Sequence, residues 1–386
     1  MAALVTANAF AEKDPKVLLD HGKDVMIAAT RGSAFSSLRG SDDNAIIKTQ
    51  QESGQNTIVT MSMLAPLRTA GVRGNDSTDN TEGKIKRMFM DVRGNVIAES
   101  DISQNKKLLT RSSWANYRRD AKNALSEWRK WVTDCEMFAK LSRDCTKITT
   151  IKADGSITED VTTLAAGDTL GAAHLDASYS RAKNGYTDAA AKRHPKMKPY
   201  RVEMGQVKGQ TTEIEVFVFL AGTASIESLG QDPLYLEKIK ELSDADKEKL
   251  PFAGGIGLYD NKMIIVDKGT WNEEDPGIVR SDTADWTDIN GQTIGGFSAY
   301  GGGAGNTIAT EVNLLLGAGA GVEPFQAVPD YMEDGDTIDS GRKLKVIIDQ
   351  FWGFEKFRPQ GKTTAEQALA WHDEDYGVQA VIATVA

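Results

Sequence analysis

Cysteine is scarce in this 386-residue sequence, which contains only Cys135 and Cys145. Two cysteines are too few for a disulfide framework, so the composition favours a protein that folds in a reducing compartment. Long apolar runs are missing too, because the longest, residues 216–221, is far shorter than the roughly 18 residues that a membrane span needs. The N-terminus lacks a basic leader and a long apolar stretch, so we interpret it as an arm and not as a secretion signal.

Metal-binding patterns are also lacking. The acidic run 330–339 has the composition of a calcium loop, but Lys345 occupies the position that needs a bidentate Glu. The cluster His372-Asp373-Glu374-Asp375 could bind a divalent cation, although we favour a solvated acidic loop. The four histidines show no zinc-ligand spacing: His21, His174, His194 and His372. We therefore expect no metal site.

Catalytic motifs fail at the positions that chemistry requires. The Gly-rich stretch 301–305 has no following Lys-Ser/Thr, and Asn306 stands where a dinucleotide motif needs Gly. The stretch 317–321 misses the same register at Val322. Ser298 is not in a nucleophile elbow, because Tyr300 replaces the second Gly. The sequence predicts no cofactor and no enzyme activity.

The charges are unevenly distributed along the chain. The net charge is −10, which argues against a protein that grips nucleic acid over its whole surface. Residues 84–130 nevertheless carry 12 basic and 5 acidic side chains, whereas residues 323–340 carry six acids and no base. We expect these segments to form complementary contacts between subunits, or the basic one to face packaged DNA.

A hairpin with an unusually long connection is predicted near the N-terminus. Residues 56–64 alternate between apolar and polar positions, and residues 84–93 do the same. The intervening excursion, Pro66 to Gly83, is much longer than the 2 to 5 residues usual in a hairpin. Apolar side chains on such a polar loop are best explained by burial against a neighbour, although a disordered surface loop remains the alternative. The predicted assembly interface comprises Leu64, Leu67, Val72 and Arg73.

A long amphipathic helix is predicted from residue 112 to residue 141. No Gly occurs between Gly94 and Gly155, and apolar residues recur every three or four positions. The predicted core face contains Trp114, Tyr117, Leu125, Trp128, Val132 and Phe138. A bare coiled coil is the alternative, but its seam prefers Leu and Ile to large aromatics. Glu136 and Lys140 are expected to form an exposed pair on this helix.

The remaining segments alternate between helix and strand. Residues 1–55 show no sustained period and are expected to form an extended, unanchored arm with at most a short helix. The other expected elements are helices at 176–191, 234–242 and 309–316, strands at 212–220, 262–267, 344–354 and 378–385, and a long loop region at 268–306. The fold class is therefore α+β.

The order of several segments resembles one known family. These segments are TIVTMSMLAPLRTAGVRG, the helix RDAKNALSEWRKWVTDCEMFAKLS, FVFLAGTASIESLGQD, GGIGLYDNKMIIVD, EVNLLLGAGAG, FWGFEKFRPQGK and DYGVQAVIATVA. Together they resemble the N-four-type major capsid proteins of tailed phages, over residues 56–386. The sequence departs from that family at residues 226–230 and at Gly319, where Gln is common.

The resemblance implies the HK-ninety-seven fold and its domains. Residues 1–55 would be an N-terminal arm and residues 56–100 the extended loop. Residues 101–174 and 343–386 would form the peripheral domain, with the spine helix at 112–141, and residues 175–342 the axial domain.

The resemblance also implies a function. The chain would assemble with itself into hexamers and pentamers of an icosahedral virion capsid, in the cytoplasm of the host bacterium. Portal, scaffolding and decoration proteins would be partners, with double-stranded DNA on the inner face and no membrane. An encapsulin-like compartment shell is the alternative within this fold, and a Gly-rich-loop enzyme is the alternative outside it.

Overall fold

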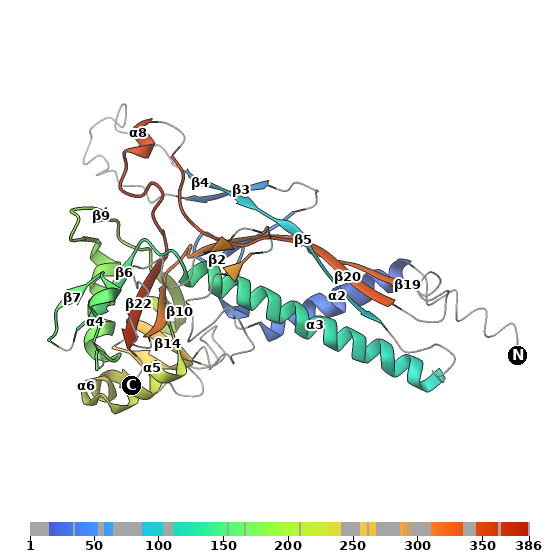
Figure 1. Cartoon of the computed structure of the whole chain (residues 1–386), viewed down its shortest axis with the longest axis horizontal. Helices are drawn as coiled ribbons and strands as arrows, with labels where there is room; N and C mark the ends of the chain where they lie inside the picture. Colours follow the sequence, from blue (N-terminus) through green and yellow to red (C-terminus); the bar gives the residue numbers. More distant parts are fainter. Residues whose placement is uncertain are drawn as a thin grey trace, which may run out of the picture.

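The computed structural model shows an elongated molecule, rounded at one end and drawn out along a long helix toward the other (Figure 1). The residues that it describes are 15–33, 35–52, 58–64, 87–102, 111–152, 154–165, 167–207, 210–240, 255–260, 262–267, 286–288, 290–291, 293–294, 310–334, 345–361 and 364–384.

Helices and two large sheets make up the described residues, which confirms the predicted α+β class. The helices are α2 (Pro15–Gly32), α3 (Arg111–Ser142), α4 (Ala172–Asn184), α5 (Thr223–Gln231), α6 (Pro233–Lys238) and α8 (Thr364–Gln367), with 3-10 turns at Ser36–Leu38 and Val161–Thr163.

The first large sheet has nine strands and lies in the rounded end. Its order is β12 (Ile239–Lys240), β13 (Gly255–Tyr259), β14 (Met263–Asp267), β11 (Gln210–Ala221), β17 (Thr310–Leu316), β22 (Val378–Thr384), β6 (Ile148–Ile151) and β7 (Ile157–Thr158), with β10 (Tyr200–Val207) also paired to β11.

The second large sheet has seven strands. Its order is β1 (Arg39–Gly40), β2 (Ile47–Gln51), β18 (Gly321–Phe325), β20 (Lys345–Trp352) and β19 (Asp330–Asp334), with β21 (Glu355–Lys356) paired to β18 and β5 (Asn95–Ile102) paired to β20. Three two-stranded pairs complete the described strands: β3 (Ile58–Leu64) with β4 (Arg87–Arg93), β8 (Tyr186–Thr187) with β9 (Arg193–His194), and β15 (Trp286–Thr287) with β16 (Thr293–Ile294).

The nine-stranded sheet is buried on both faces. Along β11, Val218 packs in the cluster that contains Phe138 of α3, whereas its neighbour Phe219 packs in the cluster that contains Leu175 of α4. Successive side chains of a strand point to opposite faces, so α3 covers one face and α4, with α5 and α6, covers the other. Full burial of each large aliphatic or aromatic side chain contributes about 1.5 to 3 kcal/mol.

Residues 310–316 form strand β17, so the helix predicted at 309–316 is wrong. β17 lies between β11 and β22 and is antiparallel to both. Every residue from Glu311 to Leu316 is buried. A strand covered on both faces has a continuous apolar sequence, which periodicity alone does not distinguish from a buried helix.

Residues 15–51 contain more regular secondary structure, and more contacts with the body, than the sequence predicted. Helix α2 has 18 residues and packs against α3, and β2 pairs in parallel with β18 over five residues. A buried hydrogen bond from Ser33 Oγ to Asp134 Oδ1 (2.5 Å) and a buried ion pair between Arg39 and Glu323 (2.9 Å) tie this segment to the body. The expectation of an unanchored arm with at most a short helix is wrong for residues 15–51.

The ends of other helices also differ from the predicted ones. Helix α4 begins at Ala172 and ends at Asn184, because Gly185 (φ 71°) terminates it, so residues 185–191 are not helical. Helix α6 ends at Lys238, and α5 was not predicted at all. The long helix α3 matches its prediction to within one residue at each end.

Candidate assembly surfaces

The β3–β4 hairpin packs on the body through one methionine-rich face. The two strands pair from Ile58 with Arg93 to Leu64 with Arg87, as the alternating sequences predicted. Their inward side chains join the body residues Val322, Phe351 and Phe357 in one apolar cluster. The inward residues are Val59, Met61, Met63, Met88, Met90 and Val92, all of which are buried. Methionine side chains adapt to irregular gaps, so this face of the hairpin can pack closely on the body.

The Gly-rich segment that follows β17 makes room for the hairpin. Gly319 has φ 74°, and a Cβ there would lie 2.4 Å from Cε of Met63. Gly377 crosses the same segment so closely that a Cβ would lie 2.6 Å from the backbone N of Ala320. Glycine is therefore required for backbone packing at these positions. Close packing therefore accounts for the glycines of residues 317–321, which match no phosphate-binding motif.

The outer face of the hairpin remains accessible. Ile58 is 52% exposed and Phe89 is 36% exposed. Leu64 is the last residue of β3, opposite Arg87. The other predicted interface residues, Leu67, Val72 and Arg73, lie outside the described residues, as does the Pro66 to Gly83 excursion.

Helix α3 links the two large sheets. Leu125 and Phe138 are buried, whereas Trp128 and Val132 are half-buried. Trp128 packs against two clusters, one beneath the nine-stranded sheet and one between α2, α3 and β20. The predicted positions of Trp114 and Tyr117 fall within α3, but their side chains lie outside the described set. The helix therefore presents an apolar face to the sheets from residue 121 to residue 141.

Glu136 and Lys140 form a buried pair, so the predicted exposed pair is wrong. Their side chains are 1% and 2% exposed, and Nζ of Lys140 lies 3.4 Å from Glu136, 3.1 Å from Asp288 and 2.7 Å from Glu355. Burial alone lowers the pKa of Lys140, but the three carboxylates outweigh it and hold the pKa above its ordinary value. The network ties α3 to β21 through Glu355 and to the residue that follows β15, Asp288.

The cluster at residues 372–375 is not a solvated loop, which corrects the interpretation favoured from the sequence. Glu374 and Asp375 are 2% and 0% exposed. Asp375 accepts a hydrogen bond from Nε of Arg358 (2.7 Å) and one from the backbone N of Thr146 (2.8 Å), and Nζ of Lys356 lies 3.6 Å away. Burial alone would raise the pKa of Asp375. The positive charges of Lys356 and Arg358 lower it by more, so the pKa lies below its ordinary value.

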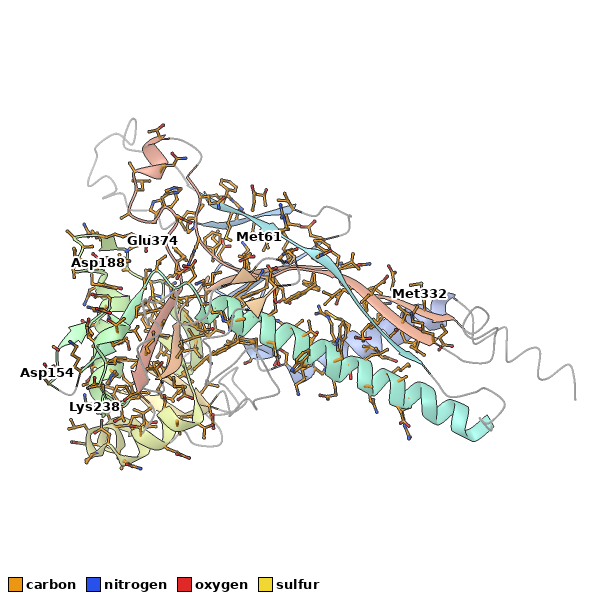
Figure 2. All side chains as sticks on the ribbon, viewed as in Figure 1. Met61, Asp154, Asp188, Lys238, Met332 and Glu374 are labelled. Carbon is orange, nitrogen blue, oxygen red and sulfur yellow. The ribbon has the colours of Figure 1, made fainter. Side chains whose placement is uncertain are left out.

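Glu374 connects the same loop to the β8–β9 hairpin. Its Oε2 lies 3.0 Å from Nδ1 of His194, and Lys192 forms an ion pair with its other oxygen. Nε2 of His194 lies 3.3 Å from Oδ2 of Asp188. Figure 2 shows Asp188 and Glu374 close together at this junction. The acidic residues therefore hold structure together, a role that sequence reasoning missed because their cationic partners are distant in the chain.

No group of three or more His, Cys, Asp or Glu side chains in the described residues could hold a metal ion. No helix in the described ranges is long and apolar enough to cross a membrane. What the described residues offer is a set of surfaces: the hairpin, the long helix and the two sheets.

A family model decides what this architecture belongs to. The model for phage capsid proteins matches residues 10–386, which is nearly the whole chain. The chain belongs to the phage capsid protein family. No curated protein sequence matches it.

Solved phage heads share the fold of this capsid protein. The head structure of Helicobacter pylori bacteriophage KHP40 superposes with a TM-score of 0.71 at 18% identity, covering 92% of this chain and 91% of that chain. The acid-stable capsid of Helicobacter pylori bacteriophage KHP30 gives 0.69 at 18% identity, with 91% and 90% covered. The capsid of Ralstonia phage GP4 gives 0.61 at 18% identity, with 92% and 91% covered. The chain thus has the HK-ninety-seven-type fold of phage shells.

Proposed function

We propose that this capsid protein is the major shell subunit of a tailed-phage head and that it assembles into hexamers and pentamers around the DNA genome. The observation that carries the proposal is the family match over residues 10–386, on a fold with a seated hairpin and a long helix. An isometric shell requires one chain to repeat its interfaces around closed symmetry. The proposed role is structural and not enzymatic.

The domain assignment is part of this proposal. Residues 1–55 are the N-terminal arm, 56–100 the extended loop, 101–174 with 343–386 the peripheral domain, and 175–342 the axial domain. The hairpin supports the second range, since β3 and β4 pair along their full length, from Ile58 with Arg93 to Leu64 with Arg87. In the proposed shell, Leu64, Leu67, Val72 and Arg73 contact a neighbouring subunit.

Further partners follow from the proposed role. A phage head that fills with DNA requires a portal, and assembly in the host cytoplasm with scaffolding or decoration proteins is part of the same proposal. The described part of α3 offers DNA little net positive charge, because Lys122 pairs with Asp24 (3.7 Å) and Lys130 with Glu127 (3.7 Å). We therefore place the DNA-facing surface elsewhere than on these residues of α3.

Electron microscopy of particles from cells that express the chain with its phage tests the proposal. Closed heads filled with double-stranded DNA, with a portal at one vertex, are expected. Empty or protein-filled shells of one size, without a portal under any condition, would contradict it and favour the encapsulin-like alternative. A nucleotide-dependent rise in melting temperature would instead revive the enzyme alternative.

A further inference from the structure

Among the described residues, one face of β5, β20 and β19 is covered by the β3–β4 hairpin only at Phe351. Helices α2 and α3 cover the opposite face, where Val346 and Ile348 are buried. On the first face, Met332 is 45% exposed and Val96 is 59% exposed. In the strand register these two exposed apolar side chains lie on either side of the row formed by Asp330, Asp349 and Ala98.

Two carboxylates face each other on this surface. Asp330 of β19 pairs directly with Asp349 of β20 in the antiparallel register. Within the described ranges, no cationic side chain forms an ion pair with either carboxylate. Burial and the charge of Asp330 raise the pKa of Asp349 above its ordinary value. Like charges directly opposite each other destabilise a sheet, so a cationic partner would relieve a cost that the isolated chain bears.

A basic patch lies on the β8–β9 hairpin and the residues after it. Residues 192–201 contain five Lys or Arg side chains and no acid, but Lys192 pairs with Glu374, Arg201 pairs with Glu215, and Nζ of Lys198 donates to the carbonyl O of Asp43. Arg193 and Lys196 are exposed, and no described acid forms an ion pair with either. The residues just before β9, Ala189 to Ala191, are exposed and small, so the patch has no bulky obstruction beside it.

The direction of the patch is fixed by the buried side of β9. His194 is held between Glu374 and Asp188, so the preceding residue, Arg193, points outward. Gly185 permits this arrangement, because a Cβ there would lie 2.7 Å from the carbonyl O of His194. Arg193 is therefore presented by β9, and Lys196 by the segment between β9 and β10.

The two surfaces are at opposite ends of the molecule. Figure 2 labels Asp188, on the hairpin, at the rounded end and Met332, on β19, near the far end of the long helix. Two patches so placed do not meet within one chain, but they meet when a second copy is added head to tail. Head-to-tail contacts of this kind close into rings when the rotation between copies closes.

We propose that the basic patch of one copy, at Arg193 and Lys196, docks on the carboxylate pair Asp330–Asp349 of a second copy. The inference rests on the proposed self-assembly and names the surfaces for one of its contacts. A guanidinium group has five N–H donors, enough to donate to both carboxylates at once, and Met332 and Val96 supply the apolar border. The partner of the Asp330–Asp349 pair is thus the basic patch of Arg193 and Lys196 on a second copy.

Charge reversal in the full chain tests the contact. One variant carries Arg193→Glu with Lys196→Glu, a second carries Asp330→Lys with Asp349→Lys, and a third carries all four changes. Each of the first two should fold, with an unchanged circular dichroism melt, and lose at least about tenfold in the yield of shells measured by sedimentation. The third restores opposite charges at every contact and should recover most of the yield.

A matched control keeps the test interpretable. Glu227→Lys with Glu237→Lys makes the same change in charge as the acidic-face variant at exposed residues of α5 and α6 and should leave the yield unchanged. Normal yields for both single-patch variants, or no recovery in the combined variant, would overturn the docking proposal while the shell proposal stands.

Failure of the parent chain to assemble at all would instead count against the shell proposal. Loss of DNA filling with normal shells in the Arg193 variant would assign the patch to phosphates and also overturn the docking proposal.

Discussion

At the scale of single residues, buried ion pairs and hydrogen bonds hold separate segments of this protein together. Asp375 is fully buried and contacts Lys356 of β21, Arg358 just after β21, and Thr146 between α3 and β6. Taking charges out of water is costly, and only complete pairing offsets the loss. The loop before β22 is therefore fixed by electrostatics as well as by apolar packing.

The substitution Asp375→Asn tests this role. It removes the charge that balances Lys356 and Arg358 and should lower the free energy of unfolding by about 3 to 5 kcal/mol. The measurement is urea unfolding of the subunit, followed by circular dichroism. Asp373→Asn is the matched control, because Asp373 is exposed and adopts φ 55°, a conformation that Asn tolerates. Equal stability of the two variants would contradict the role assigned to Asp375.

The same carboxylate predicts a dependence on pH. The pKa of Asp375 is lowered in the folded state, so its contribution is present above the unfolded pKa of about 3.9 and is lost as the pH falls through the folded value. The difference in stability between the parent and Asp375→Asn should therefore shrink as the pH is lowered below about 4. Unfolding measured at a series of pH values checks this, and a difference that grows in acid would refute it.

Replacing two aromatic residues of α3 with Ala should lower the free energy of unfolding by different amounts. Phe138 is 2% exposed, so Phe138→Ala should lower the free energy of unfolding by about 3 to 5 kcal/mol. Trp128 is half-buried, so Trp128→Ala should cost about half as much. Parallel thermal or urea unfolding of both variants gives the order. A Trp128→Ala variant as stable as the parent would remove the evidence that this helix supports the sheets through its aromatic face.

At the scale of elements, the β3–β4 hairpin packs on the body of the subunit through its strands, and we expect its excursion to act in assembly. The paired strands β3 and β4 are seated by their inward methionines, and the excursion begins where the pairing ends, at Leu64 and Arg87. Replacement of residues 68–82 by a short Gly-containing turn leaves this register intact. The variant should be soluble and cooperatively folded but unable to close a shell.

Circular dichroism melting beside sedimentation of the shortened and parent chains is the measurement for the excursion. Intact shells from the shortened chain would mean that the excursion is dispensable. Failure to fold would mean that it belongs to the core.

The elements show where sequence patterns suffice and where they do not. Long α3 and the alternating strands β3 and β4 have clear periods, so they were predicted closely. β17 was predicted as a helix because a strand buried on both faces loses its alternation. Lys140 and Glu136 looked like an exposed pair because Asp288 and Glu355, which enclose them, are distant in sequence. Partners brought together only by the tertiary fold are invisible to local patterns.

At the scale of the whole molecule, the fold and the family could be anticipated, whereas most contact surfaces could not. The order of segments along residues 56–386 carried the resemblance that the family match confirms. The basic patch at Arg193 and Lys196 was missed, because its significance depends on an acidic sheet at the opposite end of the molecule. On the described part of α3, three cations of the predicted basic segment 84–130 pair with neighbouring acids: Arg119 with Asp120, Lys122 with Asp24 and Lys130 with Glu127.

Assembly should depend on salt if complementary charges contribute to the contacts. Exposed ion pairs are individually weak and are screened over about 8 to 10 Å at physiological ionic strength. The yield of shells at a fixed subunit concentration should therefore fall between low and high salt, as measured by sedimentation. A yield that does not change with salt would show that apolar contacts alone drive assembly.

The measurement that tests the central claim most directly is electron microscopy of the purified, overexpressed full-length chain, with sedimentation of the same sample. If the chain is a shell subunit, the images should show closed isometric particles built from rings of six and five subunits, and the sediment should contain most of the folded protein. A sample that stays monomeric or forms only small oligomers, while circular dichroism shows it to be folded, would contradict the account.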